Sequence, residues 1–180
     1  MDLRMAEPAP MVNDADVAVL RLDEETPEVA RARATVLKIR LAPGQRRLAG
    51  DAVETLPRAD ADPNRTPFAV LRAHEVVGFG ILDRLGILPE ITDAPQRAVL
   101  LRAFYIAPEW QGRGVGRAAC AALDPLARAI APKAVEILLT VNEHNSVALR
   151  SYLSGGFERT GRRYLGGDVG PQLVLRRPIA

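Results

Sequence analysis

The sequence predicts an α+β fold in which helices flank a mixed, mostly antiparallel sheet. Two short apolar segments, at 67–72 and 76–82, are separated by three residues and predict an antiparallel hairpin. Between residues 98 and 164, strand-like and helix-like segments alternate without an internal repeat. A hairpin followed by this alternation is typical of helices packed on a largely antiparallel sheet, and less so of a doubly wound nucleotide-binding fold.

The length of the chain fits one domain. It has 180 residues, of which 48% are hydrophobic, so a substantial core can form. Residues 1–15 mix acidic, basic and proline residues without an apolar face, and we expect them to form a flexible lead-in. A single domain is then expected over residues 16–180.

The amino-terminal half contains one ambiguous segment. In residues 28–41, four apolar side chains share one helical face, yet residues 35–41 also suit an extended strand. Around it we expect a strand at 17–22, a turn at 42–44, a short helix at 49–58 and a loop at 59–67.

The boundaries between helices, strands and loops are clearer in the carboxyl-terminal half. Helical periodicity runs over residues 115–130, where Pro125 should kink or split the helix. The other expected elements are a loop at 84–95, an apolar strand at 98–106, a buried strand at 135–141, a helix at 146–153, and strands at 157–164 and 172–175.

Composition argues against several classes of partner. Lysine and arginine number 24 and acidic residues 22, giving a net charge of +2. The basic residues are spread along the chain without a block of five or six, so no nucleic-acid partner is expected. No stretch approaches about 18 consecutive apolar residues, and the amino terminus lacks the apolar segment of a secretory signal. We therefore expect no membrane partner and a cytoplasmic location.

Cysteine and histidine usage argues against metal and nucleophile chemistry. Cys120 is the only cysteine, which excludes an internal disulfide and agrees with a reducing compartment. It lies in an alanine-rich helical stretch, where we expect burial and not nucleophilic catalysis. His74, His144 and Cys120 show no metal-ligand spacing, so no metal is expected. No G-x-S-x-G segment is present, so a serine nucleophile is not indicated.

The most informative segment is Gln-Gly-Arg-Gly-Val-Gly-Arg at residues 111–117, between a strand and a helix. Glycines allow a tight turn, and the free N–H groups at a helix start favour an anion such as a pyrophosphate. Arg113 and Arg117 add positive charge. The pattern is neither a P-loop nor G-x-G-x-x-G, and locally the alternative is a glycine-rich turn without a ligand.

Two motifs in this sequence resemble those of the GNAT N-acetyltransferase superfamily. The first is Gln111-x-x-Gly114-x-Gly116, and the second comprises Val141, Asn145, Ala148, Tyr152, Gly156 and Phe157 at the family's spacing. Together they cover about residues 97–160, and the order of strands around them also agrees with the family. The resemblance implies the GNAT-like acyl-CoA N-acyltransferase fold. It also implies an enzyme that transfers an acetyl group from acetyl-CoA (coenzyme A) to an amine.

The resemblance further implies how acetyl-CoA is held. Backbone N–H groups of the turn would bind its pyrophosphate, and the exposed edge of the preceding strand would pair with its pantetheine arm. The N–H of Phe104 or a near neighbour would donate to the acetyl carbonyl. The implied cofactor-binding residues are Phe104, Tyr105, Ile106, Gln111, Gly112, Arg113, Gly114, Val115, Gly116, Arg117, Asn145 and Tyr152.

Tyr152 is the implied catalytic residue, because a phenol with a reference pKa near 10 stays protonated at neutral pH and can donate to the departing thiolate. Asn145 is expected to cap its helix and to reach the cofactor. Histone-acetylating relatives carry a glutamate on the strand before the turn, but residues 96–107 contain no acidic residue. A water chain could deprotonate the amine instead. Candidate bases elsewhere are Glu75, Asp83, Glu90, Asp93 and His74, with His144 as a further neighbour of the site.

The acceptor amine stays open at this point. We expect a primary amine of a small molecule, such as a polyamine, an amino acid-like amine or an antibiotic amine. Gln45, Arg102 and the pair at 111–112 are similar to the spermine/spermidine acetyltransferase-like branch, and the acidic loops at 59–67 and 84–95 favour a cationic substrate slightly. The alternatives are a protein N-terminus or lysine as acceptor, and a non-catalytic CoA-binding sensor. Exposed sheet edges near the carboxyl terminus are compatible with a homodimer.

Overall fold

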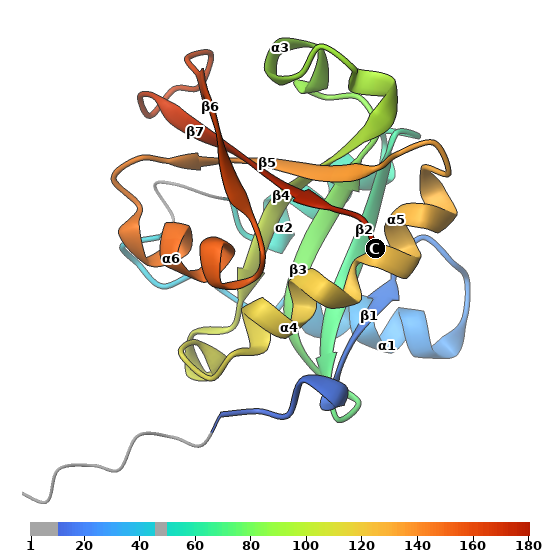
Figure 1. Cartoon of the computed structure of the whole chain (residues 1–180). Helices are drawn as coiled ribbons and strands as arrows, with labels where there is room; N and C mark the ends of the chain where they lie inside the picture. The colour runs from blue at the N-terminus through green and yellow to red at the C-terminus, as the bar shows by residue number, and fades with distance from the viewer. Residues whose placement is uncertain (1–10, 46–49) are drawn as a thin grey trace, which may run out of the picture.

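The computed structural model describes residues 11–45 and 50–180, which form one seven-stranded sheet with helices on both faces (Figure 1). The strand order is β1-β2-β3-β4-β5-β7-β6, and every neighbouring pair is antiparallel except β4 and β5. This confirms the predicted mixed, mostly antiparallel sheet. The strands are β1 (Val17–Arg21), β2 (Arg65–Arg72), β3 (Glu75–Asp83), β4 (Ala98–Ile106), β5 (Glu136–Asn142), β6 (Glu158–Tyr164) and β7 (Gln172–Pro178).

The helices resolve the ambiguities of the sequence. The segment at 28–41 is helical as far as Val36, and the Thr26 side chain caps its start by accepting from the Val29 N–H. The expected helix at 115–130 is split at Leu123, with Pro125 in the first turn of the second piece. The α-helices are α1 (Pro27–Val36), α2 (Ala52–Asp60), α3 (Leu88–Ile91), α4 (Val115–Ala122), α5 (Asp124–Ile130) and α6 (Ser146–Ser154).

Two expected loops contain regular structure. β2 begins at Arg65, inside the segment expected to be a loop at 59–67, and the short helix α3 lies within 84–95. The hairpin between β2 and β3 is confirmed, and it closes through Ala73 and His74, whose φ angles of 47° and 70° are both positive. Two positive φ angles match the primed turns that suit the twist of a hairpin.

The two faces of the sheet are covered by different helices (Figure 1). α4 and α5 pack on one face through a cluster that includes Val99, Leu123 and Ile137. α1 and α2 pack on the other face through Val36, Leu56 and Phe79. Tyr105 faces this second cluster, and its hydroxyl donates to the Ile39 carbonyl at 2.8 Å and accepts from the Ala52 N–H at 2.9 Å.

β4 and β5 separate soon after they meet. Only Ala98, Val99 and Leu100 of β4 have parallel partners in β5, at Glu136, Ile137 and Leu138. Beyond them, β4 also contains a bulge: the register to β3 passes from Arg102 to Tyr105 without partners for Ala103 and Phe104, and Ala103 has a φ of 51°. The carboxyl-terminal part of β4 therefore has an open backbone edge beside β5, and the candidate site is built there.

Candidate active site

The glycine-rich turn joins the open end of β4 to α4. Gly112 and Gly114 have φ angles of 76° and 84°, a left-handed conformation that favours glycine. Gly114 is the N-cap of α4, so the first N–H groups of this eight-residue helix have no partner within the helix. The turn therefore presents backbone donors at the positive end of a helix, as an anion site requires.

Gln111 fixes the entry to this turn. Its Nε2 donates to the Ile106 carbonyl at 2.9 Å, at the end of β4. The same side chain exchanges two longer hydrogen bonds with the Gln45 amide, at 3.3 and 3.4 Å. Gln45 and Gln111 are 66 positions apart, so the amide pair brings the segment after α1 to the mouth of the turn.

The two arginines of the turn have partners within the protein. Arg113 lies over the Trp110 ring, with its guanidinium carbon 4.8 Å from the ring centroid, and it is not among the cavity residues. Arg117 does line the cavity and forms an exposed ion pair with Asp14 at 3.1 Å. Of the two arginines expected to add positive charge at the turn, Arg117 therefore faces the cavity, whereas Arg113 stacks on Trp110.

Part of the expected lead-in contacts this turn. Residues 1–10 lie outside the described residues, whereas Val12 is buried and its N–H donates to the Arg113 carbonyl at 2.9 Å. A Cβ placed on Gly114 would lie 2.8 Å from the Met11 methyl group. Met11 and Val12 therefore pack directly against the anion-binding turn.

A cavity of about 850 Å³ runs from the turn, past the open edge of β4, to the amino-terminal end of β2. Its lining residues range from Met11 to Gln172, so no single segment of the sequence predicts this cavity. Of the predicted cofactor-binding residues, those that line it are Phe104, Tyr105, Ile106, Gln111, Gly112, Gly114, Gly116, Arg117, Asn145 and Tyr152. Val115 does not line it, because its side chain is buried in the core.

Tyr152 reaches the cavity from α6. Its ring packs between Phe104 and Phe157, with centroid distances of 6.1 and 5.8 Å. Burial raises the pKa of Tyr152 above its usual value, with a smaller contribution from Cys120, so the phenol stays protonated well past neutral pH. Asn145 caps the same helix, its side-chain oxygen accepting from the Ala148 N–H at 3.2 Å.

None of the candidate bases lines the cavity. Asp83 is buried, and its two oxygens accept from Arg65, Arg102 and the Leu85 N–H. Within residues 11–45 and 50–180, the cavity lining contains no aspartate, glutamate or histidine. The remaining candidates, Glu75, Glu90, Asp93, His74 and His144, lie elsewhere as well.

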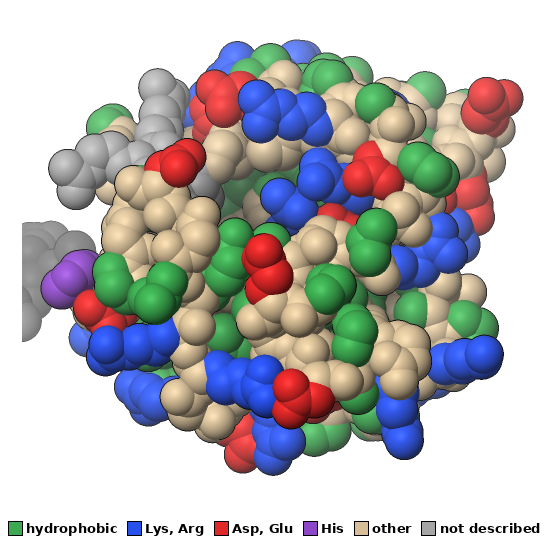
Figure 2. All heavy atoms as spheres, turned by 90° about the horizontal axis from the view of Figure 1, so that it is seen from above, with side chains coloured by type: hydrophobic (Ala, Val, Ile, Leu, Met, Phe, Trp, Pro, Cys, Tyr) green, Lys and Arg blue, Asp and Glu red, His purple; other side chains and the backbone are tan. Residues whose placement is uncertain are grey.

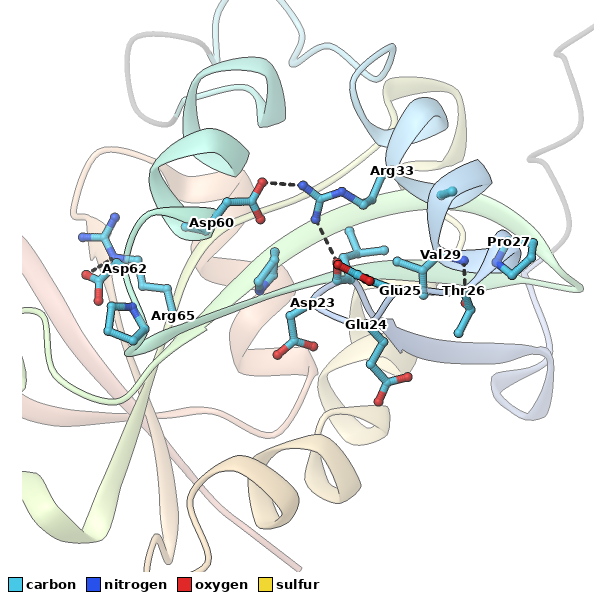
Figure 3. A pocket seen from close by; sticks show the side chains of 15 residues that line it. Asp23, Glu24, Glu25, Thr26, Pro27, Val29, Arg33, Asp60, Asp62 and Arg65 are labelled. Atoms are coloured by element: carbon cyan, nitrogen blue, oxygen red, sulfur yellow. Dashed lines mark hydrogen bonds and ion pairs between the residues drawn. The ribbon is translucent and has the colours of Figure 1, made fainter.

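The acidic loops do not face the cavity, so they give no support to a cationic substrate there. Asp60 is paired with Arg33, Asp62 with Arg65, and Asp93 with Arg162. Asp60 and Asp62 belong to a separate open groove of about 790 Å³ beside α1 (Figure 3). Figure 3 shows Arg33 reaching across this groove from α1 to Asp60 at the end of α2.

The sequence indicated Arg102 and Arg117 but not the other three basic residues that line the cavity. Arg58 and Arg65 line it from the consecutive elements α2 and β2, and Arg150 lines it from the distant helix α6. Each looks like an ordinary surface arginine in its own segment, so only the fold brings them together.

Among the described residues, we find neither a reactive cysteine nor a metal site that would add a second functional site. Cys120 is buried, and burial raises the pKa of its thiol to about 12, which agrees with a packing role. Among the described residues, no group of three His, Cys, Asp or Glu side chains is arranged to hold a metal. A search of the same residues finds no helix with the length and apolarity to cross a membrane.

Comparisons with known proteins agree with the geometry. The model of the acetyltransferase (GNAT) family matches residues 33–157. The uncharacterized N-acetyltransferase YbbJ of Bacillus subtilis (strain 168) is 32% identical over 123 residues, which cover 68% of this chain and 76% of that protein.

Two solved structures show the same fold. The aminoglycoside acetyltransferase AAC(6')-Ib, in complex with coenzyme A and kanamycin, has a TM-score of 0.69 and 21% identity, over 90% of this chain and 94% of that one. A spermidine N-acetyltransferase SpeG chimera from Vibrio cholerae and hSSAT has a TM-score of 0.59 and 19% identity, over 91% and 95%. At these identities, the likeness concerns the fold alone.

Proposed function

The chain belongs to the acetyltransferase (GNAT) family and uses acetyl-CoA, and from this membership we propose that it acetylates a primary amine of a small molecule. The amine and acetyl-CoA would be bound together, and the amine would attack directly. A polyamine, an amino acid-like amine and an antibiotic amine are the classes considered.

One observation carries this proposal. The glycine turn, the open edge of β4 and Tyr152 all border the same cavity. A long ligand with an anionic end and an amide-rich arm fits this arrangement, because the turn offers N–H groups to the anion and the strand edge offers backbone groups to the arm. The residues present therefore fit acetyl-CoA.

The chain's own groups would then act as follows. Acetyl-CoA supplies an activated thioester. The N–H groups of Arg113 to Gly116 would hold the pyrophosphate, together with that of Gly112, because the Gln111 N–H expected to take part donates to the Pro108 carbonyl at 3.3 Å. Asn145 would contact the arm. Because the bulge leaves Ala103 and Phe104 without partners in β3, the Phe104 N–H would be available to the acetyl carbonyl, where it would stabilise the charge that develops on oxygen.

The proton balance assigns a role to Tyr152. The amine nitrogen forms a bond to the acetyl carbon while the carbon–sulfur bond breaks, and the Tyr152 hydroxyl donates its proton to the departing sulfur. The proton lost by the nitrogen passes to water, from which Tyr152 is reprotonated. This route needs no carboxylate base, in agreement with the cavity lining.

The test is a calorimetric titration with acetyl-CoA, followed by a thiol-release assay over polyamines, amino acids, aminoglycosides and short peptides. Gly112→Asp should abolish acetyl-CoA binding, because it places a strained, negative residue in the anion turn. Gly161→Asp is the matched control: Gly161 has a φ of 85°, and like Gly112 it has open space at its Cβ position, but it lies in β6 away from the cavity. The control should bind normally.

The outcomes separate the alternatives. No binding of acetyl-CoA to the unmodified protein would contradict the proposal at its base. Binding without thiol release on any amine would favour a CoA-binding sensor, and release only with peptides would favour a protein acetyltransferase.

A further inference from the structure

In the described part of the chain, the side chains that line the cavity and carry a charge at neutral pH are all basic. Among the described residues they are Arg58, Arg65, Arg102, Arg117 and Arg150. Seen from above, Lys and Arg side chains lie at the edge of the hollow in the upper half of Figure 2. A polyamine or an aminoglycoside carries several positive charges, and burying them beside guanidinium groups without a carboxylate is unfavourable.

Three of these arginines lie at the end of the cavity away from the anion turn. Arg102 precedes the end of β4 by four residues, about 13 Å of extended strand. Arg65 is opposite Asp83 in the sheet register, and Asp83 is in turn opposite Leu100 of β4. Arg58 is in the last turn of α2, which packs on β2. We call Arg58, Arg65 and Arg102 the arginine cluster.

A buried carboxylate orients two members of the cluster. The Asp83 side chain is 1% exposed, and one of its oxygens accepts from Arg65 Nε at 3.2 Å and from Arg102 Nη1 at 3.0 Å. A guanidinium group has five N–H donors, so both arginines keep donors for another acceptor. Asp83 itself does not line the cavity. It therefore fixes the two side chains without presenting a negative charge to a ligand.

Arg58 has no counter-ion among the described residues. Its side chain is exposed, and no hydrogen bond or ion pair joins it to residues 11–45 or 50–180. Arg65 also pairs with Asp62 at 3.3 Å, so the three positive charges of the cluster face two carboxylates, those of Asp62 and Asp83, and one positive charge stays unbalanced. Bidentate arginine contacts are the usual way in which proteins bind carboxylate and phosphate groups.

We propose that the acceptor is a primary amine that also carries an anionic oxygen group, a carboxylate or a phosphonate, which the arginine cluster binds. This inference rests on the proposed function, and it selects the amino acid-like class over polyamines and aminoglycosides. The amine would then point toward Phe104 and Tyr152 while its anionic group contacts Arg58, Arg65 and Arg102.

The experiment compares acceptors that differ in one charge. The standard amino acids, their carboxamides, aminoalkyl phosphonates and spermidine are assayed for thiol release with saturating acetyl-CoA. We expect the best carboxylate or phosphonate to exceed its neutral counterpart by about tenfold or more in kcat/KM, as for a hydrogen bond to a charged group. The carboxylate and phosphonate arms show which anion the site prefers.

Arg58→Glu is the decisive variant, because Arg58 is exposed and its loss leaves no buried partner behind. It should lower kcat/KM for the anionic amine by about tenfold or more, mainly through KM, and raise that for spermidine. Arg33→Gln, in the separate groove, is the control and should stay within about twofold of the unmodified enzyme.

Two results would overturn the inference. If spermidine or a carboxamide is the best acceptor of the unmodified enzyme, the proposed function stands and the anionic acceptor is wrong. If no amine is acetylated although acetyl-CoA binds, the proposed function fails, and a titration of succinate or inorganic phosphate into CoA-saturated protein decides the inference. Anion binding that Arg58→Glu abolishes would support it, and absence of binding would refute it.

Discussion

Two hollows meet at Arg65, and their charges are opposite. The groove beside α1 is lined by five carboxylates, those of Asp23, Glu24, Glu25, Asp60 and Asp62, with Arg33 and Arg65 as its basic residues. The cavity is lined by five arginines and, in its described lining, no acidic residue. Arg65 Nε lies 3.3 Å from Asp62 in the groove and 3.2 Å from the buried Asp83.

The groove and the cavity differ in the solvent exposure of the carboxylates that pair with their arginines. In the groove, pairs such as Arg33–Asp60 are exposed, so water screens them and either partner can move. Beneath the cavity, the counter-ion Asp83 is removed from solvent, and its arginines are held in one arrangement. A fixed arginine with unused donors can serve as a binding group, whereas an exposed pair mainly affects solubility.

The largest difference should come from Tyr152→Phe in the cavity. Loss of a general acid typically costs at least about a hundredfold in rate, so kcat should fall by about that factor while acetyl-CoA binding is retained. Steady-state kinetics and calorimetry on the same preparation measure both quantities. An unchanged kcat would exclude Tyr152 as the proton donor, and no variant of the groove should produce a comparable loss.

The next difference concerns stability. Asp83→Asn weakens the charge-assisted hydrogen bonds that two partly exposed arginines donate to this carboxylate, and it should lower the free energy of unfolding by about 2–3 kcal/mol. Asp60→Asn, the matched change in the groove, should cost less than about 1 kcal/mol because that pair is exposed. Urea unfolding of both variants measures the contrast. Equal losses would mean that the burial of Asp83 has no energetic consequence.

The smallest expected effect concerns the free energy of unfolding at alkaline pH. Burial raises the pKa values of Cys120, Tyr105 and Tyr152 in the folded protein, so the unfolded chain loses these protons first and stability falls as pH rises. Between pH 7 and 10, Cys120→Ala should remove about 1.4 kcal/mol of this fall, the amount for one thiol with an unfolded pKa of 9.0. Unfolding measured at both pH values tests this. An unchanged pH dependence would show that the thiol is not responsible.

The fold was predictable because its elements carry local signals. Pro125 split the helix where it was expected to, and the apolar runs became β4 and β5. The segment at 59–67 was harder, because Pro67 and its polar neighbours suggested a loop although Arg65 already pairs with Asp83. Pairing with the end of β3 extends β2 into this segment, and the local sequence does not show that pairing.

The candidate site was predictable only in part. Glycines of the turn and the spacing to Tyr152 are contiguous patterns, so the resemblance to the family could reveal them. Arg58, Arg65 and Arg102 come from three separate elements, and their common cavity depends on strand register and on the packing of α2. The acidic loop at 59–67 pointed to a cationic acceptor because sequence shows charge but not the side of the sheet that a charge faces.

The sheet consists of two halves that are joined only by the short parallel pairing of β4 with β5. Three residue pairs join strands drawn from residues 17–106 to strands drawn from residues 136–178, so each half-sheet is a contiguous piece of chain. A ligand that hydrogen-bonds along the open edges of β4 and β5 would connect the two half-sheets. Cofactor loading would then slow amide hydrogen exchange in both half-sheets at once, making the ligand a structural member of the sheet as well as a reactant.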